Sequence, residues 1–446
     1  MFLRARQAVL LLLIIHILLL STGGICKSTA APASPGEASR LLSEYLKVDT
    51  SNPPGNEIRA ALFFKKIFER EGIENEIFEY APGRANFFAI LRGSGGGIVL
   101  FNHSDVVPAD RKTWSIDPFS GMVRDGFIYG RGALDMKGTA VMQMMAMILL
   151  KRNKVPLKRD VIFLSVADEE CLSTGSEWMI NSKKGLLKEA EFLLNEGENI
   201  HPPEGERKEV LYAVSPTEKS PLWLRLTASG TPGHASEPNP DSAVNHLLGA
   251  LQKITAYQPP EVLLPAARKF IRDLRLTEAE FVSSSYGYAT THNTIVVTGL
   301  KGSSNINVIP SEAAAEVDCR LLPGEDPDRF TDRLRSLIAD DKVEVKVLFS
   351  YPANASSIDT ALFRAIEKAA RRRDPKCIVT SPISTSSNDS HYFRELGIVC
   401  YNFEPYRADD DENARSHGDD ERISVENIEF GTVFYYDVLT EMNRQP

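Results

Sequence analysis

The chain has 446 residues and a net charge of -9 at pH 7; 43% of its residues are hydrophobic and 25% are charged. A chain of this length can form two domains with buried cores, and its composition excludes a fibre, a disordered tail and a repeat array. Acidic and basic residues are interspersed, which argues against nucleic acid as a partner and favours a small or peptidic substrate.

The first 31 residues have the three-part layout of a secretory signal. Arg4 and Arg6 precede an apolar run from Ala8 to Leu20, and small residues follow this run. The run is about 13 residues long, whereas a membrane-spanning helix needs about 20. We therefore expect an exported protein, periplasmic, secreted or in the lumen of the secretory pathway. The alternative is an uncleaved segment that anchors the chain to a membrane.

Residues 32–216 are predicted to form the first part of a catalytic domain. Helical patterns cover residues 37–48, 57–71 and 138–150, and apolar runs typical of buried strands cover residues 86–91, 98–101, 161–166 and 192–194. This alternation predicts an α/β fold in which a mostly parallel sheet has helices on both faces. Ligands of such sheets gather at the carboxyl ends of the strands.

The pattern changes over residues 217–346. Strand-like stretches at 222–228, 314–320 and 343–349 are interleaved with helical patterns at 242–256 and 326–338. This βαββαβ-like order predicts a small α+β domain of two layers, inserted as a lid into the catalytic domain. Residues 258–291 show no pattern that we can assign. Over residues 347–446 the α/β pattern returns, as the second part of the catalytic domain.

Four cysteines follow the predicted signal, at positions 171, 319, 377 and 400. An exported protein can form disulfides, but four scattered cysteines in so long a chain are not a disulfide framework. We expect buried free thiols.

Five separated stretches of the chain contain a side chain that can bind a metal ion, and most of them follow an apolar run. These side chains are His103, Asp135, Glu170, Glu196 and His417. Two histidines and three carboxylates, with Glu169 as a further carboxylate beside them, are the groups that a two-metal hydrolase needs.

Taken singly, these residues also have structural explanations. Asp105 follows His103 by two positions beyond a strand, so it can orient the imidazole, but the pair could equally be a surface histidine and a capping aspartate. Asp135 could be the N-cap of the following helix. The adjacent Glu169 and Glu170 repel each other unless a cation or a shared proton is present, or unless their loop is solvated. Only the joint occurrence of these residues favours a metal centre.

The order and spacing of these motifs resemble the zinc metallopeptidase family that includes aminoacylase, glutamate carboxypeptidase, acetylornithine deacetylase and succinyl-diaminopimelate desuccinylase (peptidase clan MH, family 20). The resemblance covers residues 41–426. Its most specific parts are GRGALDMKG at residues 130–138 and DEE at residues 168–170, and the segment DTSNPPGNE at residues 49–57 is also similar to the family.

The resemblance implies a role for each candidate residue. Asp135 would bridge two zinc ions, with His103 and Glu196 completing one site and Glu170 and His417 the other. Glu169 would be the general base and later the acid, and Asp105 would stand behind His103. The resemblance also implies a cis peptide bond between Asp135 and Met136.

The lid contributes three candidates through the same resemblance. His234, in the stretch GTPGHAS, resembles a histidine that reaches into the active site, often from a partner subunit, and stabilises the oxyanion. Asn307 and Arg320 resemble a pair that holds the carboxylate or carbonyl of the substrate, and the planar guanidinium of arginine suits a carboxylate. The alternatives are a turn residue for His234 and an exposed strand arginine for Arg320. A homodimer formed through the lid is a further expectation.

These observations predict a metal-dependent hydrolase that cleaves an amide bond next to a free carboxylate, as a carboxypeptidase, a dipeptidase or an N-acyl-amino-acid hydrolase. The cofactors would be two zinc ions, although mixed histidine and carboxylate sites also accept manganese or cobalt. The substrate would be a small peptide or an N-acyl amino acid. One alternative is a small-molecule deacylase, such as a desuccinylase or a deacetylase. Another is a binding ectodomain that has kept the fold without catalysis.

Overall fold

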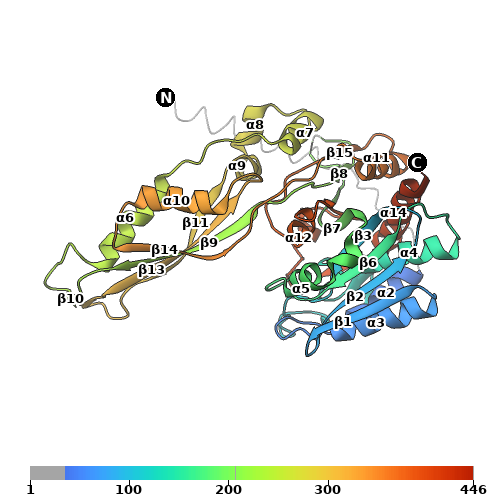
Figure 1. The fold of residues 1–446 in the computed structure, drawn as a ribbon, viewed down its shortest axis with the longest axis horizontal. Coiled ribbons are helices and arrows are strands. Elements are labelled where there is room, and N and C mark those ends of the chain that lie inside the picture. The colour runs from blue at the N-terminus through green and yellow to red at the C-terminus, as the bar shows by residue number, and fades with distance from the viewer. Residues whose placement is uncertain (1–35, 206, 445–446) are drawn as a thin grey trace, which may run out of the picture. The chain divides into compact units, whose positions relative to one another are not determined.

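The computed structural model describes residues 36–205 and 207–444 (Figure 1). The predicted secretory signal, residues 1–31, lies outside the described residues. Among the helices that are described, none combines the length and apolar character needed to cross a lipid bilayer. The four cysteines are free thiols; Cys319, Cys377 and Cys400 are buried, but Cys171 is exposed, so the prediction of a buried thiol is wrong for that residue.

An eight-stranded sheet forms the centre of the larger domain (Figure 1). The neighbouring strands β6, β3, β7 and β16 run parallel, whereas β1, β2 and β8 pair in antiparallel fashion. The predicted α/β fold with a mostly parallel sheet is confirmed. In spatial order the strands are β1 (Glu74–Ala81), β2 (Arg84–Leu91), β6 (Val161–Val166), β3 (Gly97–His103), β7 (Ala190–His201), β8 (Leu211–Ala213) and β15 (Ile378–Thr380), with β16 (Val399–Arg407) paired to β7.

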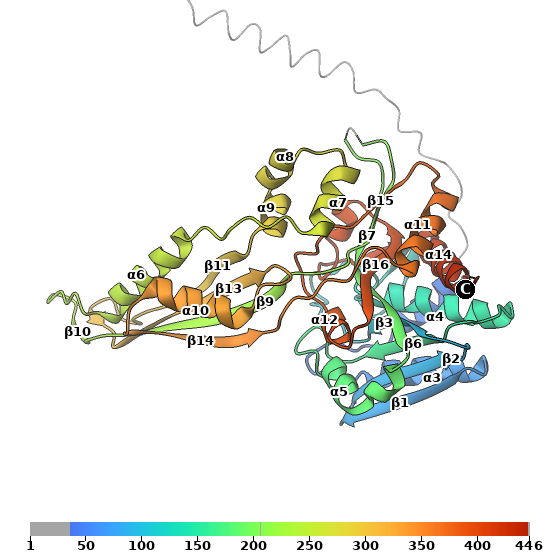
Figure 2. The same ribbon diagram turned by 45° about the horizontal axis from the view of Figure 1, so that its top comes forward.

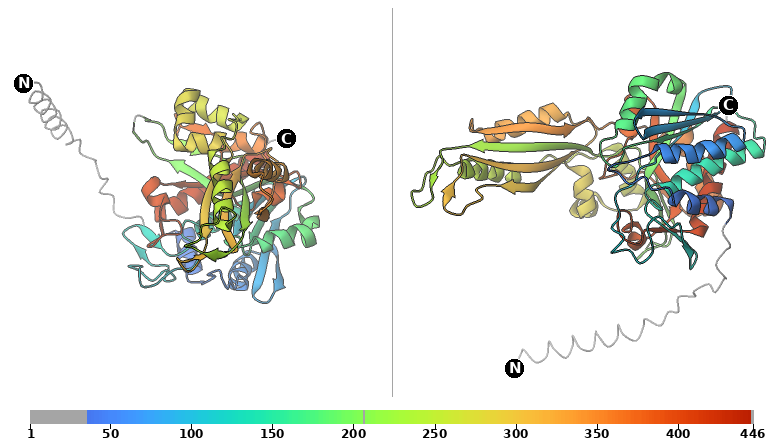
Figure 3. Two further views of the ribbon diagram at one scale, coloured as in Figure 1. Left: turned by 90° about the vertical axis from the view of Figure 1, so that its left-hand side faces the viewer. Right: turned by 90° about the horizontal axis from the view of Figure 1, so that it is seen from below.

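Helices cover both faces of this sheet, as predicted (Figures 2 and 3). Side chains alternate between the faces along a strand, so Ile98 and Leu100 of β3 belong to one buried cluster and Val99 and Phe101 to another. The first cluster includes residues of α2 (Glu37–Leu46), α3 (Ile58–Arg70), α4 (Lys137–Arg152), α11 (Ala361–Arg373) and α14 (Val425–Arg444), and the second includes residues of α5 (Thr174–Lys183) and α12 (Ser390–Arg394).

A four-stranded antiparallel sheet forms the inserted domain. Two helices cover one of its faces, with Leu247 and Phe330 in the shared core. The chain order of strands and helices is βαββαβ, so the predicted two-layer α+β architecture is confirmed (Figures 1 and 2). The strands, in spatial order, are β11 (Thr294–Lys301), β13 (Glu312–Leu321), β9 (Ser220–Ser229) and β14 (Val343–Ser350), and the helices are α6 (Ala243–Ala256) and α10 (Pro327–Ile338).

The stretch that the sequence left unassigned, residues 258–291, contains three short helices. They pack into a small apolar cluster of their own, in which Ile271 and Phe281 meet Ile383 of the larger domain. A capping box formed by Thr277 and Glu280 begins the second of these helices. The helices are α7 (Pro265–Asp273), α8 (Glu278–Ser283) and α9 (Ser285–Thr291).

Two small sheets and two short helices complete the described elements. A three-stranded sheet joins the loop before α4 to the strand before α14, and a two-stranded sheet lies in the lid. The elements are β4 (Val123–Arg124), β5 (Phe127–Tyr129) and β17 (Arg422–Ser424), then β10 (Gly233–His234) and β12 (Val308–Ile309), then α13 (Asp410–Asn413) and the 3-10 helix η1 (Lys184–Leu187).

Candidate active site

The carboxyl ends of three adjacent parallel strands bring candidate ligands to one edge of the central sheet. His103 is the last residue of β3 and is paired in register with Val166, the last residue of β6. Glu169 and Glu170 follow β6 directly, and Glu196 lies in β7 on the other side of β3. The sequence predicted this arrangement because the polar residues follow apolar strands.

Asp135 is held in a loop just before α4 by a buried carboxylate. The Oε1 atom of Glu421 accepts the amide N–H groups of Leu134 at 2.7 Å and Asp135 at 3.2 Å. Its Oε2 atom accepts the amide of Gly132 at 3.0 Å and the guanidinium of Arg131 at 2.6 Å. Gly132 has a φ of +89°, and an added Cβ would lie 2.7 Å from a side chain, so this turn requires glycine.

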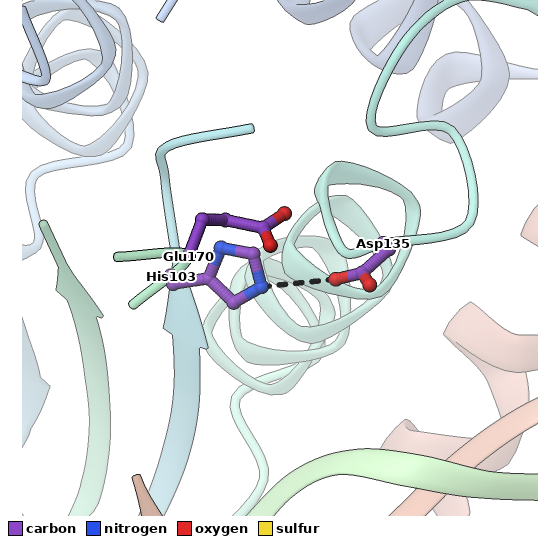
Figure 4. A group of neighbouring side chains, drawn as sticks. All are labelled: His103, Asp135 and Glu170. Atoms are coloured by element: carbon purple, nitrogen blue, oxygen red, sulfur yellow. Dashed lines mark hydrogen bonds and ion pairs between the residues drawn. The ribbon is translucent and has the colours of Figure 1, made fainter. Parts of the chain in front are cut away.

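The carboxylate of Asp135 lies between two histidines. Its Oδ1 atom is 3.0 Å from Nε2 of His103 (Figure 4), and its Oδ2 atom is 3.0 Å from Nε2 of His417. Nε2 of His103 is also 3.3 Å from Oε2 of Glu196, and Nε2 of His417 is 3.2 Å from Oε2 of Glu170. The structure therefore brings all five predicted ligands together, with Asp135 in the middle. The peptide bond between Asp135 and Met136 is cis.

The donor atoms of this cluster fit a pair of divalent cations. Two ligand atoms that each lie about 2.05 Å from a tetrahedral zinc ion are roughly 3.3 Å apart, close to the separations seen here. Oε1 of Glu170 is buried and has no hydrogen-bond partner among the described residues. Imidazole nitrogens and carboxylate oxygens suit zinc, manganese or cobalt.

The charges of these groups are mutually dependent. Burial lowers the pKa of His103, but Glu196, Asp105 and Asp135 outweigh it and raise the pKa well above its usual range. Hydrogen bonds with Asp135 and Glu170 raise the pKa of His417 to about 10. The two histidines in turn hold the pKa of Asp135 well below its usual range, against the effect of its burial. The site therefore strongly favours positive charge next to its carboxylates.

Glu169 is suited to accept a proton in the same cavity. It offers a carboxylate oxygen within 4.8 Å of donor atoms of His103 and Glu196. Burial, followed by the charge of Glu196, raises its pKa well above the usual range. A glutamate in such surroundings is a stronger base than an exposed one.

Asp105, which the resemblance places behind His103, supports two parts of the site. Nδ1 of His103 lies 3.0 Å from the carbonyl oxygen of Asp105 and 3.6 Å from its Oδ1 atom. The two carboxylate oxygens each accept an amide N–H, from Glu169 and from Glu170, at 3.1 Å. Asp105 thus orients the imidazole through its backbone and holds the two glutamates through its side chain.

Two further positioning residues escaped the sequence analysis. Nδ2 of Asn52 donates to Asp105 and to Asp168, both at 2.8 Å. Asn52 lies in the segment of residues 49–57 that resembles the family, and this resemblance could have indicated a role for it. Glu421 follows two aspartates in a stretch that is typical of a solvated turn, so no local pattern indicated that it is fully buried.

A buried hydrogen-bond chain connects the base of the lid to Glu196. Glu218, just before β9, forms an ion pair with Arg394 at 2.5 Å and accepts a bond from Asn402 at 3.1 Å. Ser390 donates to Asn402 at 2.8 Å and accepts from Asn195 at 3.0 Å. The side-chain oxygen of Asn195 accepts the amide of Glu196 at 2.8 Å. These contacts connect the backbone at Glu196, a predicted ligand, to Glu218, which precedes the first lid strand.

The cluster opens into a cavity of about 930 Å³ that residues of both domains line. Arg320 of β13 is among the lining residues. Its guanidinium lies 2.9 Å from Oδ1 of Asp318 and 3.5 Å from the hydroxyl of Ser387. The predicted carboxylate-binding arginine therefore shares the cavity with four of the predicted metal ligands, Asp135, Glu170, Glu196 and His417.

His234 and Asn307 lie elsewhere. Both are exposed, and they are not among the residues that line the cavity. They lie close to each other, because β10 pairs with β12 and the amide of Ala235 donates to the carbonyl of Asn307 at 3.0 Å. Nδ1 of His234 is 2.7 Å from the hydroxyl of Ser236. The structure thus separates two of the three lid candidates from the metal ligands of the same chain.

Residues 99–441 match the peptidase family M20/M25/M40. The chain is similar to the N-fatty-acyl-amino acid synthase/hydrolase PM20D1 of Homo sapiens, with 27% identity over 410 residues, covering 84% of this chain and 80% of that protein. It is 27% identical to aminoacylase-1A of Rattus norvegicus over 387 residues, covering 85% of this chain and 89% of that protein. In fold it is similar to the M20 family metallo-carboxypeptidase Sso-CP2 of Sulfolobus solfataricus, with a TM-score of 0.73, 18% identity and coverage of 92% and 100%.

Proposed function

The chain belongs to peptidase family M20/M25/M40 and is a hydrolytic enzyme, and we propose that it hydrolyses the amide bond of N-acyl amino acids, next to their free carboxylate. The observation that carries this proposal is the position of Asp135 between His103 and His417, with Glu169 in the same cavity. Support for the substrate comes from the relatives named as an aminoacylase and as an N-fatty-acyl-amino acid hydrolase.

The five ligands of the cluster would hold two divalent cations, for which we propose zinc. Bound cations of this kind polarise the carbonyl to be attacked and lower the pKa of water. Glu169 takes a proton from the attacking water as the new carbon–oxygen bond forms. It then gives a proton to the amine nitrogen as the carbon–nitrogen bond breaks, so the products are a carboxylic acid and an amino acid.

Arg320 would bind the free carboxylate of the substrate. Its guanidinium lines the cavity. Nε and Nη2 of Arg320 donate to the two carboxylate oxygens of Asp318 at 2.9 and 3.2 Å, and this pair fixes the orientation of the guanidinium. Nη1 is left for the substrate, because its contact of 3.5 Å with Ser387 is long for a hydrogen bond. Glu169 lines the same cavity, where it would act on the amide bond of a substrate held in this way.

We also propose that the enzyme is an exported homodimer that associates through the lid. The layout of residues 1–31 supports export, and sequencing the N-terminus of the mature protein would test it. The exposed position of His234 supports a role in the cavity of a second subunit, as the resemblance implies. Sedimentation analysis of the purified protein should then give twice the mass of one chain; a monomer would refute this part of the proposal.

A hydrolysis screen tests the function. The purified enzyme, supplied with zinc, is offered N-acetyl amino acids, dipeptides, N-succinyl amino acids and peptides with a blocked carboxyl end. We expect hydrolysis of the N-acetyl amino acids, loss of activity with a chelator, and no activity on amides that lack the free carboxylate. Hydrolysis of dipeptides alone, or full activity in the presence of the chelator, would contradict the proposal.

A further inference from the structure

One wall of the cavity is a row of aromatic side chains that the proposed reaction leaves without a role. The row consists of Trp223, Phe349 and Tyr351, which all line the cavity. The ring centroids of Trp223 and Phe349 are 5.2 Å apart, and those of Phe349 and Tyr351 are 5.7 Å apart. Tyr351 in turn stacks on His391 at 3.6 Å. The row thus connects the lid sheet to α12.

The aromatic row is partly exposed, which is unusual for such large apolar side chains. The exposed fraction is 43% for Trp223 and 38% for Phe349. The two neighbours of Trp223 in sequence, Leu222 and Leu224, are buried under the lid helices. An exposed group of aromatic rings on the wall of a cavity indicates a site that binds an apolar group.

The strand register places the aromatic row beside Arg320. Trp223 of β9 pairs with Asp318 of β13 on one side and with Phe349 of β14 on the other. Arg320 follows Asp318 by two positions, so its side chain lies on the same face of the sheet. Diagonal neighbours of this kind are within reach of long side chains. A group held by Arg320 therefore meets the aromatic row next.

On β9 and β13 this face becomes charged beyond the aromatic row. The next outward residues along the strands are Arg225 of β9 and Glu316 of β13, which form an exposed ion pair at 2.7 Å. At the other end of the aromatic row, burial lowers the pKa of His391 to about 3, so this imidazole is uncharged at neutral pH. Within the cavity, an apolar ligand group would therefore find a favourable surface along the aromatic row.

We infer that the aromatic row binds the side chain of the amino acid whose carboxylate Arg320 holds, so that the enzyme prefers aromatic and large aliphatic amino acids. This inference rests on the proposed function. The side chain and the carboxylate of an amino acid are attached to the same carbon atom, so a carboxylate at Arg320 leaves the side chain next to Trp223 and Phe349. The acyl group, on the far side of the amide nitrogen, extends toward other residues of the cavity.

The test compares N-acetyl-phenylalanine with N-acetyl-alanine on the full-length enzyme loaded with zinc. For the wild type, kcat/KM should be at least about tenfold higher for the phenylalanine substrate, as expected for a large side chain in an apolar site. Trp223→Ala should reduce this ratio about tenfold, and Trp223→Phe, which keeps a ring, should preserve most of it. Val296→Ala is the matched control, because Val296 pairs with Asp318 on the same face, is 55% exposed and does not line the cavity.

The outcomes separate this inference from the proposed function. If N-acyl amino acids are not hydrolysed at all, the proposed function fails. The wild type could instead hydrolyse both substrates with equal efficiency, or Trp223→Ala and Val296→Ala could change the ratio alike. Either result would refute binding of the amino-acid side chain by the aromatic row and leave the proposed function intact. A second series, with acetyl, hexanoyl and decanoyl groups on alanine, tests whether the aromatic row binds the acyl group instead. An effect of Trp223→Ala on acyl length instead of on the amino acid would overturn the inference.

Discussion

The metal centre and the lid loop that bears His234 hold their functional side chains in different ways. At the metal centre, the predicted ligands lie on or just beyond buried strands and in loops, and Asp105 and Glu421 fix the backbone of these loops with hydrogen bonds. His234 lies in a strand of two residues, and its side-chain partner is Ser236 of the same loop. One region is arranged within a single chain, whereas the other is exposed and available to a second molecule.

This contrast indicates which catalytic groups need a fixed position and which can be supplied by a movable loop. Ligands and base need fixed positions, because a metal site tolerates deviations of only about 0.2 Å in its distances. A group that acts when the substrate binds can be supplied by a mobile element, since closure of such elements commonly completes an active site. We therefore expect substitutions at the metal centre to lower kcat for every substrate. Substitutions in the lid should change the association of subunits or the preference among substrates.

The largest effect is expected at Glu169. Glu169→Gln keeps the size of the side chain but removes the base, so kcat should fall about a thousandfold while the bound metal is unchanged. Steady-state kinetics and metal analysis of the same preparation measure both quantities. Glu177→Gln, on the exposed side of α5, is the control and should have wild-type activity. A Glu169→Gln enzyme with more than a tenth of the wild-type rate would exclude its role as the base.

His234→Ala tests whether the lid loop takes part in the reaction. If His234 stabilises the oxyanion from a second subunit, its removal should lower kcat about a hundredfold with little change in metal content. Glu237→Ala, three residues further along the same exposed loop, should leave kcat unchanged. Mixing His234→Ala chains with Glu169→Gln chains should restore part of the activity, because one mixed site then has both groups. Wild-type turnover in His234→Ala would show that the lid loop takes no part in the reaction.

Glu421→Gln tests whether the backbone around Asp135 is truly fixed by its buried neighbour. The amide group would place a donor against Arg131 and the Gly132 amide, and the charge of Arg131 would lose its partner. We expect a 10–100-fold loss in metal affinity or activity, which is typical of residues behind metal ligands, and a decrease in the free energy of unfolding of about 3–5 kcal/mol. Glu426→Gln, which is exposed on α14, should change neither. Unaltered metal affinity in Glu421→Gln would contradict this account of the loop.

The smallest effect concerns the stability of the lid. His246 of α6 is hydrogen-bonded to Asp340 at 2.7 Å and to Asp241 at 3.0 Å, and these bonds raise its pKa above the usual 6.5. Its contribution to the free energy of unfolding is therefore complete below pH 6.5 and is lost as the pH rises through the raised pKa. Because the pKa values of both aspartates are lowered, they stay charged over this range.

His246→Gln should consequently lower the thermal unfolding temperature more at about pH 5.5 than at about pH 9. Differential scanning calorimetry of the variant and the wild type measures this difference. Asn245→Gln, at the neighbouring position of α6, provides a comparison without a titrating group. A shift of equal size at both pH values would show that the charge of His246 is unimportant.

Much of the fold was predictable because its apolar runs are continuous. The strand predicted at residues 161–166 agrees with β6, which is buried along its whole length. Strand β1 was missed, because its sequence, ENEIFEYA, has neither a continuous apolar run nor regular alternation, and only Phe78 is buried. The helices of residues 258–291 were missed because they are short and depend on contacts with Ile383, a hundred residues away in sequence.

The metal ligands were predictable for a related reason. His103, Glu170 and Glu196 follow apolar runs, and Asp135 lies in a glycine-containing stretch. His417 has no such local signal, and the assignment of the ligands to two metal sites came from the resemblance to the family. The buried partners Glu218 and Glu421 could not be inferred, because a carboxylate that pairs with Arg394 or Arg131 has the same local sequence as an exposed one. Burial of a charge depends on contacts that are distant in sequence, and the local pattern of apolar residues gives no information about such contacts.

If Asp135 bridges two metal ions, three alanine variants should differ in the number of ions that they bind. Inductively coupled plasma mass spectrometry on dialysed protein should give two zinc ions per wild-type chain. The variants His103→Ala and His417→Ala should each bind about one ion, because each histidine is a ligand of one site. Asp135→Ala should lose both ions, since its two oxygens face the two histidines. A wild type with one ion, or an Asp135→Ala variant that keeps two, would contradict the account.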